Sequence, residues 1–277
     1  MKRKTEFDFS RDAKVLLFDL ECSPTLSWNY GQYESNAVKV EKPPVLLSVA
    51  WKWLGDTKTE CLTIADKPLE DRFDCSLVVD KLWHLLDEAN VAIAHNISFD
   101  IKLATAFFLR QGMTPPSPYR TFCTLQAARR YFRTDNNKLD YLGELLGVGR
   151  KEKITNADVW YDVLFGDGQL RKKQNQLLRK YNVQDVELLE KIYLKLRPFV
   201  YNHPNLALAS GHDVCPRCGR NEGFTLSKYR YTGMQVNAVQ YQCKSCGSYV
   251  TRRLDKEERE ELEAQGKLKS TFRNLCP

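Results

Sequence analysis

Apolar runs separated by short polar segments predict a mixed α/β domain in the first two thirds of the chain. Residues 15–20 form an apolar run bounded by charges, which predicts a buried strand. Residues 45–53 and 60–65 are rich in strand-forming side chains, and a Leu-Gly-Asp segment at 54–56 is typical of a turn between them. We therefore expect these three strands to pair as an antiparallel meander.

Apolar residues at helical spacing predict the elements that follow. Residues 76–89 are expected to form an amphipathic helix, 91–94 a short strand and 99–111 a second helix. A proline-rich segment at 114–118 breaks the chain before a fifth strand around 119–122. Further helices are predicted at 125–132, 138–146, 156–164 and 169–196, the last ending before Pro198. This order favours a mixed five-stranded sheet with helices packed on it.

Composition narrows the class of protein without fixing its function. The 277 residues can form one large domain and a small one, and 43% hydrophobic content is typical of globular proteins. The net charge of +7 is compatible with nucleic acid but does not require it. No apolar stretch reaches the roughly 18–20 residues of a membrane span, and the basic N-terminus precedes no apolar signal core. We expect a cytoplasmic protein, in the host cytoplasm if the source is viral, that binds no membrane.

The nine cysteines indicate a metal site. Five are scattered, whereas the other four form two CxxC pairs, each followed by glycine, with a 24-residue spacer. This spacing is typical of a tetrahedral structural zinc site in a zinc ribbon, and the scatter of the other thiols argues against disulfides. The predicted ligands are Cys215, Cys218, Cys243 and Cys246.

A change in composition near residues 203–213 marks a domain boundary. Gly, Cys, Tyr and Arg become more frequent, and residues 255–265 form a charge-dense helical segment before a basic tail. We predict a first domain of residues 1–205 and a small β zinc-ribbon domain of residues 206–277.

Carboxylates gather in three short clusters. Asp19 and Glu21 are two apart on a predicted strand and so share one face of the sheet. Tyr181 and Asp185 are four apart on a predicted helix and share its face, while Asp100 follows a strand end. Like charges a few Å apart repel by roughly 4 kcal/mol per pair at intermediate dielectric, and divalent cations remove that cost.

Each cluster alone has a simpler explanation. Asp19 can be a solvated start of a loop, Asp100 an acid at a helix N-terminus, and Asp185 a surface acid. The apolar surroundings of Asp19 and Glu21 and the conjunction of all three clusters favour a two-metal site.

The order DxE, Asn-x-x-Phe-Asp, Tyr-x-x-x-Asp resembles the DEDD superfamily of 3′→5′ exonucleases, in its tyrosine branch, which includes the proofreading domains of DNA polymerases. Residues 121–129 and 138–147 resemble further segments of that family, so the resemblance covers roughly residues 12–200. It implies an RNase H-like fold and release of nucleoside 5′-monophosphates from single-stranded ends. It also implies two Mg²⁺ or Mn²⁺ ions.

The resemblance assigns roles residue by residue. Asp19, Glu21 and Asp185 would hold the ion that activates water, and Asp19 with Asp100 the ion that stabilises the leaving oxygen. Tyr181 would position the attacking water. Substrate contacts are expected at Leu20, Cys22, His95, Asn96 and Phe99.

The substrate sugar is left open by a departure from the family. Cys22 and Ser23 replace a threonine that is frequent in polymerase proofreaders, in a loop that approaches the terminal sugar. The motif style favours DNA over RNA as substrate, and a replication or repair protein is a possible partner. His95 lies in the second motif, whereas the other branch has its histidine in the third, so His95 either shapes the strand end or contacts substrate.

The zinc ribbon offers a second nucleic-acid surface. Basic and aromatic residues alternate at Lys228, Tyr229, Arg230 and Tyr231, a composition suited to single strands. Residues 212–277 hold 12 basic and 8 acidic side chains, a surplus of only four, so two other roles stay open: the ribbon docks a protein or merely caps the first domain.

Three alternative functions remain at this point. The first is a 3′→5′ exoribonuclease, and the second is a non-catalytic nucleic-acid-binding adaptor that uses its zinc ribbon. The third is an endonuclease on the RNase H-like fold, which the tyrosine motif disfavours.

Overall fold

The chain divides into two compact units, one of residues 14–196 and one formed mainly by the residues from 197 onward. The computed structural model describes residues 13–31, 33, 36–66, 72–151, 158–210, 214–232 and 235–266, of which 209–210, 231–232 and 235–236 by backbone alone. The compact units separate slightly before the boundary predicted between 205 and 206. No helix in these ranges has the length and apolar character needed to cross a membrane.

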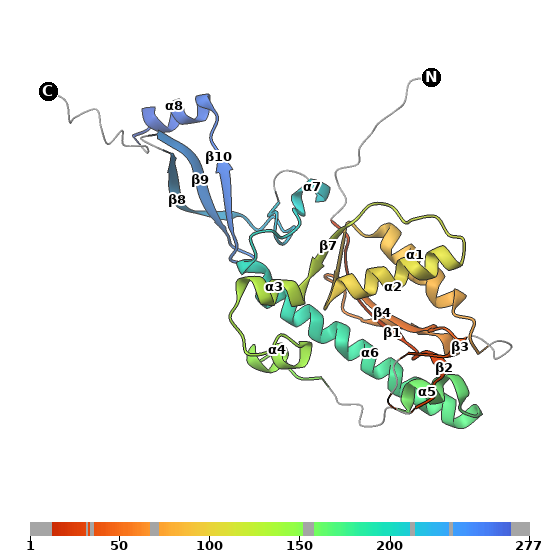
Figure 1. Cartoon of the computed structure of the whole chain (residues 1–277). Coiled ribbons are helices and arrows are strands. Elements are labelled where there is room, and N and C mark those ends of the chain that lie inside the picture. Colours follow the sequence, from red (N-terminus) through yellow and green to blue (C-terminus); the bar gives the residue numbers. More distant parts are fainter. Residues whose placement is uncertain are drawn as a thin grey trace, which may run out of the picture. The chain divides into compact units, whose positions relative to one another are not determined.

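The first unit contains a mixed five-stranded sheet and the helices that cover it (Figure 1). Its strands are β1 (Val15–Cys22), β2 (Leu26–Trp28), β3 (Lys39–Lys42), β4 (Leu46–Trp53), β5 (Glu60–Thr63), β6 (Val91–Ala94) and β7 (Arg120–Cys123). Its helices are η1 (Ile64–Asp66), α1 (Ser76–Glu88), α2 (Ile97–Arg110), α3 (Thr124–Tyr131), α4 (Leu139–Leu145), α5 (Val159–Phe165) and α6 (Gly168–Leu196).

The strand order is β5-β4-β1-β6-β7, with β1 in the centre. β1 pairs antiparallel with β4, and β4 antiparallel with β5, which confirms the predicted meander. β6 and β7 extend the sheet in parallel with β1. The predicted mixed sheet flanked by helices is therefore confirmed.

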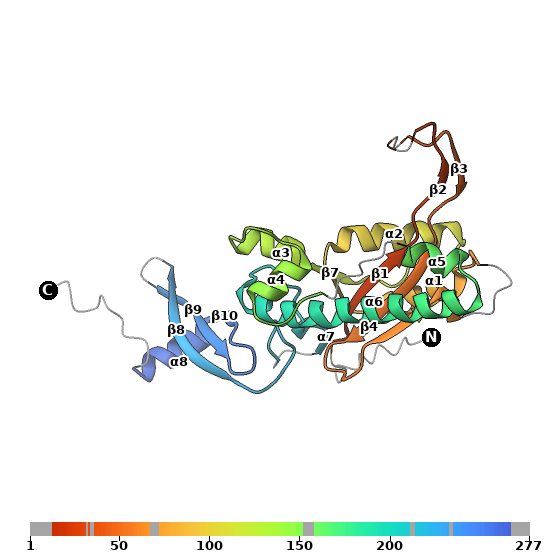
Figure 2. The ribbon, with the colours of Figure 1, turned by 90° about the horizontal axis from the view of Figure 1, so that it is seen from below.

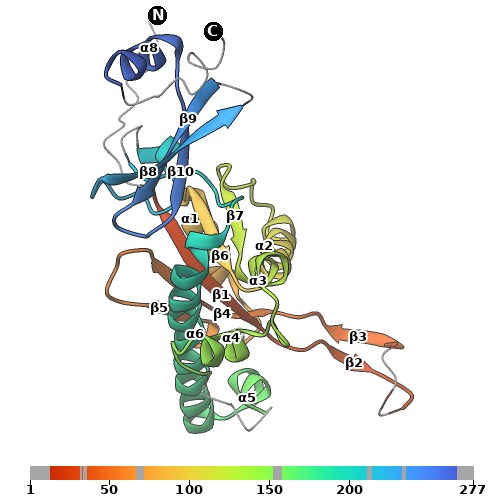
Figure 3. The same ribbon diagram turned by 90° about the vertical axis from the view of Figure 1, so that its left-hand side faces the viewer.

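Alternation along β1 separates a core face from a polar face. Leu16, Phe18 and Leu20 belong to the main hydrophobic core, together with residues of α1 and α2. Asp19 and Glu21 point to the opposite face because side chains alternate along a strand. α6 packs across β1, β4 and β5, and Figure 3 shows α6 and α2 on opposite sides of the sheet. The long helix thus faces the two acids.

Several predicted ends differ from the structure. The second helix begins at Ile97 rather than 99, because the turn after β6 closes at Asn96 in a left-handed conformation. The segment predicted as strand to residue 65 turns into the 3-10 helix η1 after Thr63. Residues 156–157, predicted to begin a helix, lie outside the described residues, and α5 begins at Val159.

The hairpin of β2 and β3 was not predicted. Its strands are mostly exposed on both faces and so lack the alternation that marks a half-buried strand. Figure 2 shows the pair projecting away from the five-stranded sheet.

The second unit is a small antiparallel sheet, ordered β10-β9-β8. Val239 and Leu254 form a small core there, with Tyr229, Tyr241 and Leu262 packed against it. Its elements are η2 (Arg197–Phe199), α7 (Ala207–Ser210), β8 (Phe224–Thr232), β9 (Gln235–Cys243), β10 (Tyr249–Arg253) and α8 (Lys256–Ala264).

Candidate metal centres

Three carboxylates from two elements meet in the first unit. Asp19 and Glu21 come from β1 and Asp185 from α6, and each offers an oxygen within 4.8 Å of the others. These acids are far apart in the chain and adjacent in the fold because α6 crosses the sheet over β1. Carboxylate oxygens are the ligands that Mg²⁺ and Mn²⁺ prefer. The sequence-predicted triad is thus assembled with the donor set of a hard divalent cation.

Burial makes these carboxyl groups hard to ionise together. Desolvation, with repulsion from Asp185, raises the pKa of Glu21 to about 7. Desolvation also raises the pKa of Asp185 to about 6, against the lowering effect of Lys151. The pKa of Asp19 is raised well above its ordinary value by burial first and by Asp185 and Glu21 next. A bound cation would offset the repulsion between these carboxylates, which adds to the effect of burial on their pKa values.

Lys151 partly compensates the charge of Asp185. Its ammonium lies 2.5 Å from Asp185 Oδ2 and donates to the Tyr181 hydroxyl at 2.5 Å. It also lies 4.4 Å from the centre of the Tyr181 ring. Burial by itself would lower the pKa of Lys151, but Asp185 and Tyr181 raise it. The lysine therefore stays charged and fixes both side chains.

One oxygen of Asp185 is left for another ligand. Oδ1 is buried and has no hydrogen-bond partner within the part of the chain that the structure describes. A buried carboxylate oxygen without a partner is unfavourable unless a cation or water satisfies it. Together with the hard oxygen donors of Asp19 and Glu21, this orphaned atom fits a divalent cation.

A hydrogen-bond chain through Asn182 holds Asp19. Asn182 is fully buried on α6, and its amide donates to Asp19 Oδ2 at 2.8 Å. The amide oxygen accepts from Ser48 Oγ of β4 at 2.9 Å. Sequence reasoning missed this residue, although its place beside Tyr181 and three before Asp185 puts it on the same face of the helix.

Trp160 holds Glu21 in the same way. Its indole N–H donates to Glu21 Oε2 at 2.8 Å, and its ring lies edge-on to Tyr181 with centroids 6.0 Å apart. Neither Trp160 nor Lys151 was predicted as a site residue. Both lie in short segments that carry no spacing signal of their own.

Asp100 stands beside the triad rather than in it. The three acids whose oxygens come within 4.8 Å of one another do not include it. Asp100 is buried in the first turn of α2, and burial, followed by repulsion from Glu21, raises its pKa to about 7 against hydrogen bonds from its own backbone and that of Leu20. It contributes to the raised pKa of Asp19, so it shares the same electrostatic environment.

The residues expected to contact substrate are placed differently from one another. Leu20 packs into the hydrophobic core, so its side chain points away from the acidic face. Cys22 is partly exposed, Asn96 is exposed and Phe99 is 52% exposed, so these three are accessible. His95 Nδ1 lies 2.9 Å from Thr124 Oγ1. Burial lowers the pKa of His95 to about 4 against a hydrogen bond to the backbone of Asn137, so its place favours shaping the strand end.

A depression of about 590 Å³ opens beside Lys151. Polar and charged side chains dominate its lining, which includes Asn96, Arg129, Asn136, Asn137, Asp140 and Lys151.

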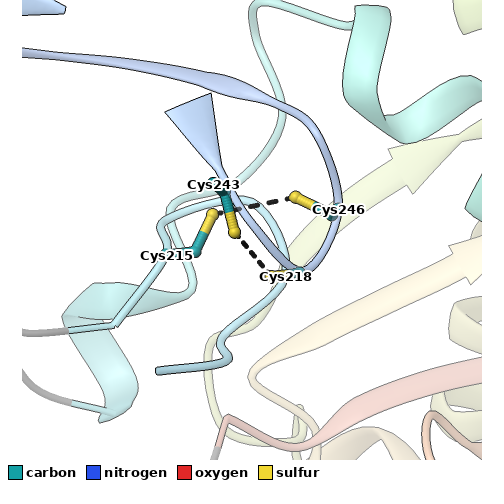
Figure 4. Close-up of side chains that lie close together, drawn as sticks. All are labelled: Cys215, Cys218, Cys243 and Cys246. Atoms are coloured by element: carbon teal, nitrogen blue, oxygen red, sulfur yellow. Dashed lines mark hydrogen bonds between the residues drawn. The ribbon is translucent and has the colours of Figure 1, made fainter. Parts of the chain in front are cut away.

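The four predicted cysteines form a compact quartet in the second unit (Figure 4). Cys215 Sγ lies 3.9 Å from Cys246 Sγ, and Cys218 Sγ lies 3.8 Å from Cys243 Sγ. A tetrahedron with metal–sulfur distances of about 2.3 Å has sulfur–sulfur edges of about 3.8 Å. The spacing therefore fits a metal ion of the size and geometry of Zn²⁺, with all four positions filled by protein.

Two glycines shape the turns that carry these thiols. Gly219 and Gly247 adopt φ of 72° and 74°, a left-handed conformation that favours glycine. Each donates its N–H to the carbonyl of the first cysteine of its pair, at 2.8 Å and 2.9 Å. The CxxCG pattern is thus used twice for the same local geometry.

On the ribbon strand β8, most of the described side chains are exposed. Lys228 and Arg230 are exposed, whereas Tyr229 packs against the small core around Val239. The side chain of Tyr231 lies outside the described residues. Of the four expected nucleic-acid contacts here, Lys228 and Arg230 are the two that the described side chains present to solvent.

No protein-family model matches the chain, and no curated protein is significantly similar to it in sequence.

Proposed function

We propose that the protein is a metal-dependent 3′→5′ exonuclease of the tyrosine branch of the DEDD superfamily, with an RNase H-like fold. The observation that carries this proposal is the approach of Asp19, Glu21 and Asp185 to within 4.8 Å of one another beside Tyr181. The substrate is single-stranded nucleic acid, with DNA favoured, and the products are nucleoside 5′-monophosphates.

The donor set suits two divalent cations, Mg²⁺ or Mn²⁺. Asp19, Glu21 and Asp185 would hold one, with the orphaned Oδ1 of Asp185 as a ligand atom, and Asp100 with Asp19 would support the other. When bound, such ions activate water and stabilise negative charge on a leaving oxygen.

The chain's own side chains orient the reactants. The Tyr181 hydroxyl, which accepts a hydrogen bond from Lys151, would form a second hydrogen bond with the attacking water. That water attacks the terminal phosphorus, the bond from phosphorus to the 3′ oxygen of the preceding nucleotide breaks, and the 3′ oxygen takes up a proton. Asn182 and Trp160 keep the carboxylates of Asp19 and Glu21 in place, so little reorganisation is needed during the reaction.

In this proposal the zinc ribbon holds a structural ion and assists the binding of substrate. Zn²⁺ bound by four cysteines has no open position for water, so it supports the fold of the ribbon rather than the chemistry. Exposed Lys228 and Arg230 would contact the phosphate backbone of the substrate.

The test is digestion of single-stranded DNA and RNA of one sequence, labelled at the 5′ end, with Mg²⁺ or Mn²⁺. Wild type is expected to shorten the strands from the 3′ end, and Asp19→Asn and Asp185→Asn to lose the activity. Glu187→Gln is the matched control, because Glu187 is an exposed carboxylate on the same helix. Bound but uncut strands would favour the adaptor, and internal cuts the endonuclease.

A further inference from the structure

The β2–β3 hairpin presents three aromatic rings to solvent. Trp28 is 65% exposed, Tyr30 is 89% exposed and Tyr33 is 95% exposed. Leu26, Val38 and Val40 on the same hairpin are each at least 43% exposed. Single exposed apolar residues are normal, but a cluster of this kind marks an interaction surface.

The hairpin follows directly on β1, the strand that carries Asp19 and Glu21, and leads into its antiparallel partner β4. β1 and β4 still pair at Cys22 and Leu46, one residue beyond Glu21. Ser23 N–H then donates to the Val45 carbonyl at 2.9 Å, and Val45 N–H donates to Ser23 Oγ at 3.0 Å. The base of the hairpin is thus fixed to the central strands, and a molecule lying along it is directed to Glu21.

Contacts within the hairpin orient Trp28. Its indole N–H donates to Glu41 Oε1 at 2.8 Å, and Lys39 Nζ lies 3.1 Å from the same oxygen. At the base, Lys42 Nζ lies 4.8 Å from the centre of the Phe73 ring. Lys39 neutralises the charge of Glu41, so the carboxylate that holds the Trp28 ring adds no net negative charge beside it.

We propose that this hairpin is a stacking arm for single-stranded nucleic acid, which it binds upstream of the 3′ end. Tryptophan and tyrosine rings stack on any base, which suits an enzyme that digests successive nucleotides. Residues 24–44 hold two lysines and two glutamates, so the arm binds through its rings rather than through charge. This inference rests on the proposed function, because the route to Glu21 identifies the occupant as the substrate strand.

The arm sets a length requirement for the substrate. At about 3.3 Å per extended residue, Trp28 is at most about 23 Å along the chain from Glu21. That distance corresponds to about seven stacked nucleotides at about 3.4 Å each. A strand of about 12 nucleotides is therefore long enough to span the triad and the arm, whereas a strand of about three makes fewer contacts with the rings.

The test compares two triple variants of the full chain. One carries Trp28→Ala, Tyr30→Ala and Tyr33→Ala, and the matched control carries phenylalanine at the same three positions and so keeps the rings. Binding of labelled oligothymidylate of about 12 nucleotides is measured by fluorescence anisotropy, with Asp19→Asn present in every protein to prevent cleavage. Since each base–aromatic stack contributes about tenfold in affinity, we expect loss of all three rings in the alanine variant to raise Kd by up to about 1,000-fold, and the phenylalanine variant to raise it less than about tenfold.

In proteins that retain Asp19, kcat/KM is measured on strands of about 12 and about three nucleotides. The proposal predicts that the alanine substitutions lower kcat/KM at least about tenfold more on the long strand than on the short one. Equal losses of kcat/KM on both lengths, or a Kd equal to that of wild type, would contradict the role of the hairpin as a stacking arm without contradicting the proposed exonuclease activity.

Two further outcomes separate the arm from the proposed function. If wild type binds the strand through its rings but cleaves nothing, the arm stands and the exonuclease fails. If the alanine variant converts a dimer to a monomer in light scattering while its Kd is unchanged, the rings bind a second copy of the chain and the proposal is wrong.

Discussion

At the scale of single residues, the acidic centre is defined as much by the groups that hold the carboxylates as by the carboxylates themselves. Asn182 fixes Asp19, Trp160 fixes Glu21, and Lys151 fixes Asp185 together with Tyr181. Partners of metal-bound carboxylates typically contribute about 10–100-fold in metal affinity or activity. The centre is therefore sensitive to substitutions that touch no substrate.

Replacing Asn182 tests this dependence. Asn182→Leu keeps the volume of the side chain and removes the hydrogen bond to Asp19 Oδ2, so we expect Mn²⁺ affinity to fall about 10–100-fold. Isothermal titration calorimetry measures the affinity directly. Ser48→Ala removes only the hydrogen bond from Ser48 Oγ to the Asn182 amide oxygen, so it is expected to lower Mn²⁺ affinity less. Equal Mn²⁺ affinity in Asn182→Leu and wild type would show that Asp19 needs no positioning.

The raised pKa values predict how stability depends on pH without divalent cations. The pKa values of Glu21 and Asp100 are about 7 and that of Asp185 is about 6, whereas unfolded Asp and Glu titrate near 4. The folded state thus binds more protons than the unfolded state between pH 4 and 7, so the free energy of unfolding falls as pH rises through that range. A tenfold difference in proton affinity between the two states corresponds to about 1.4 kcal/mol.

Thermal unfolding in EDTA at pH 5 and pH 8 measures this effect. We expect Tm to be lower at pH 8, with Mg²⁺ restoring it there in wild type but not in Asp185→Asn. A Tm that rises from pH 5 to pH 8 in the absence of divalent cations would contradict the assignment of these acids as a buried, repelling group.

At the scale of elements, the sequence predicts best what depends on local pattern. The apolar run of β1 and the long periodic segment of α6 are found nearly as expected, and they bring together Asp19, Glu21 and Asp185. The β2–β3 hairpin escaped prediction because it buries neither face. Lys151 and Trp160 escaped as site residues because their roles come from contacts across the fold, which no spacing in their short segments reveals.

Close packing of α4 against the segment that leads to Lys151 gives an element-scale prediction. A Cβ at Gly143 would lie 2.5 Å from the Gly149 carbonyl oxygen and 2.8 Å from Leu188 Cδ1. We expect Gly143→Ala to lower the free energy of unfolding by about 1–3 kcal/mol and to lower nuclease activity by displacing Lys151.

Gly168→Ala is the matched control, because nothing lies within 4 Å of a Cβ there. It is expected to leave stability unchanged or raise it by about 0.4–1 kcal/mol. Urea unfolding measures both variants. A Gly143→Ala protein as stable as wild type would show that the backbone at Gly149 shifts freely.

At the scale of the whole molecule, each of the two units carries one candidate metal site, an acidic triad in one and a sulfur quartet in the other. The sulfur quartet was predictable in full from CxxC spacing, since four thiols in two identical turns have few other arrangements. The three acids of the triad were predictable as a set. The compensation of the Asp185 charge by Lys151 was not, because only folding brings this lysine to the triad. Sequence therefore predicts well which acids and thiols lie together, and predicts poorly the side chains that support them.

Metal content tests the assignment of the quartet. We expect one zinc per chain by elemental analysis and its loss in Cys218→Ser, with faster hydrogen exchange in β8, β9 and β10 because a structural zinc site contributes folding free energy. Cys75→Ala is the control, since Cys75 is buried in the core of the other unit. Retention of zinc in Cys218→Ser would contradict the four-thiolate site.

Hydrolysis at the 3′ end by the acidic centre is tested most directly by the identity of the product. Single-stranded DNA is digested with Mg²⁺ in water enriched in the heavy oxygen isotope, and the products are analysed by mass spectrometry. We predict nucleoside 5′-monophosphates with one heavy oxygen in the phosphate, absent when Asp19→Asn replaces wild type. Oligonucleotide fragments, or nucleotides without heavy oxygen, would contradict the proposed reaction.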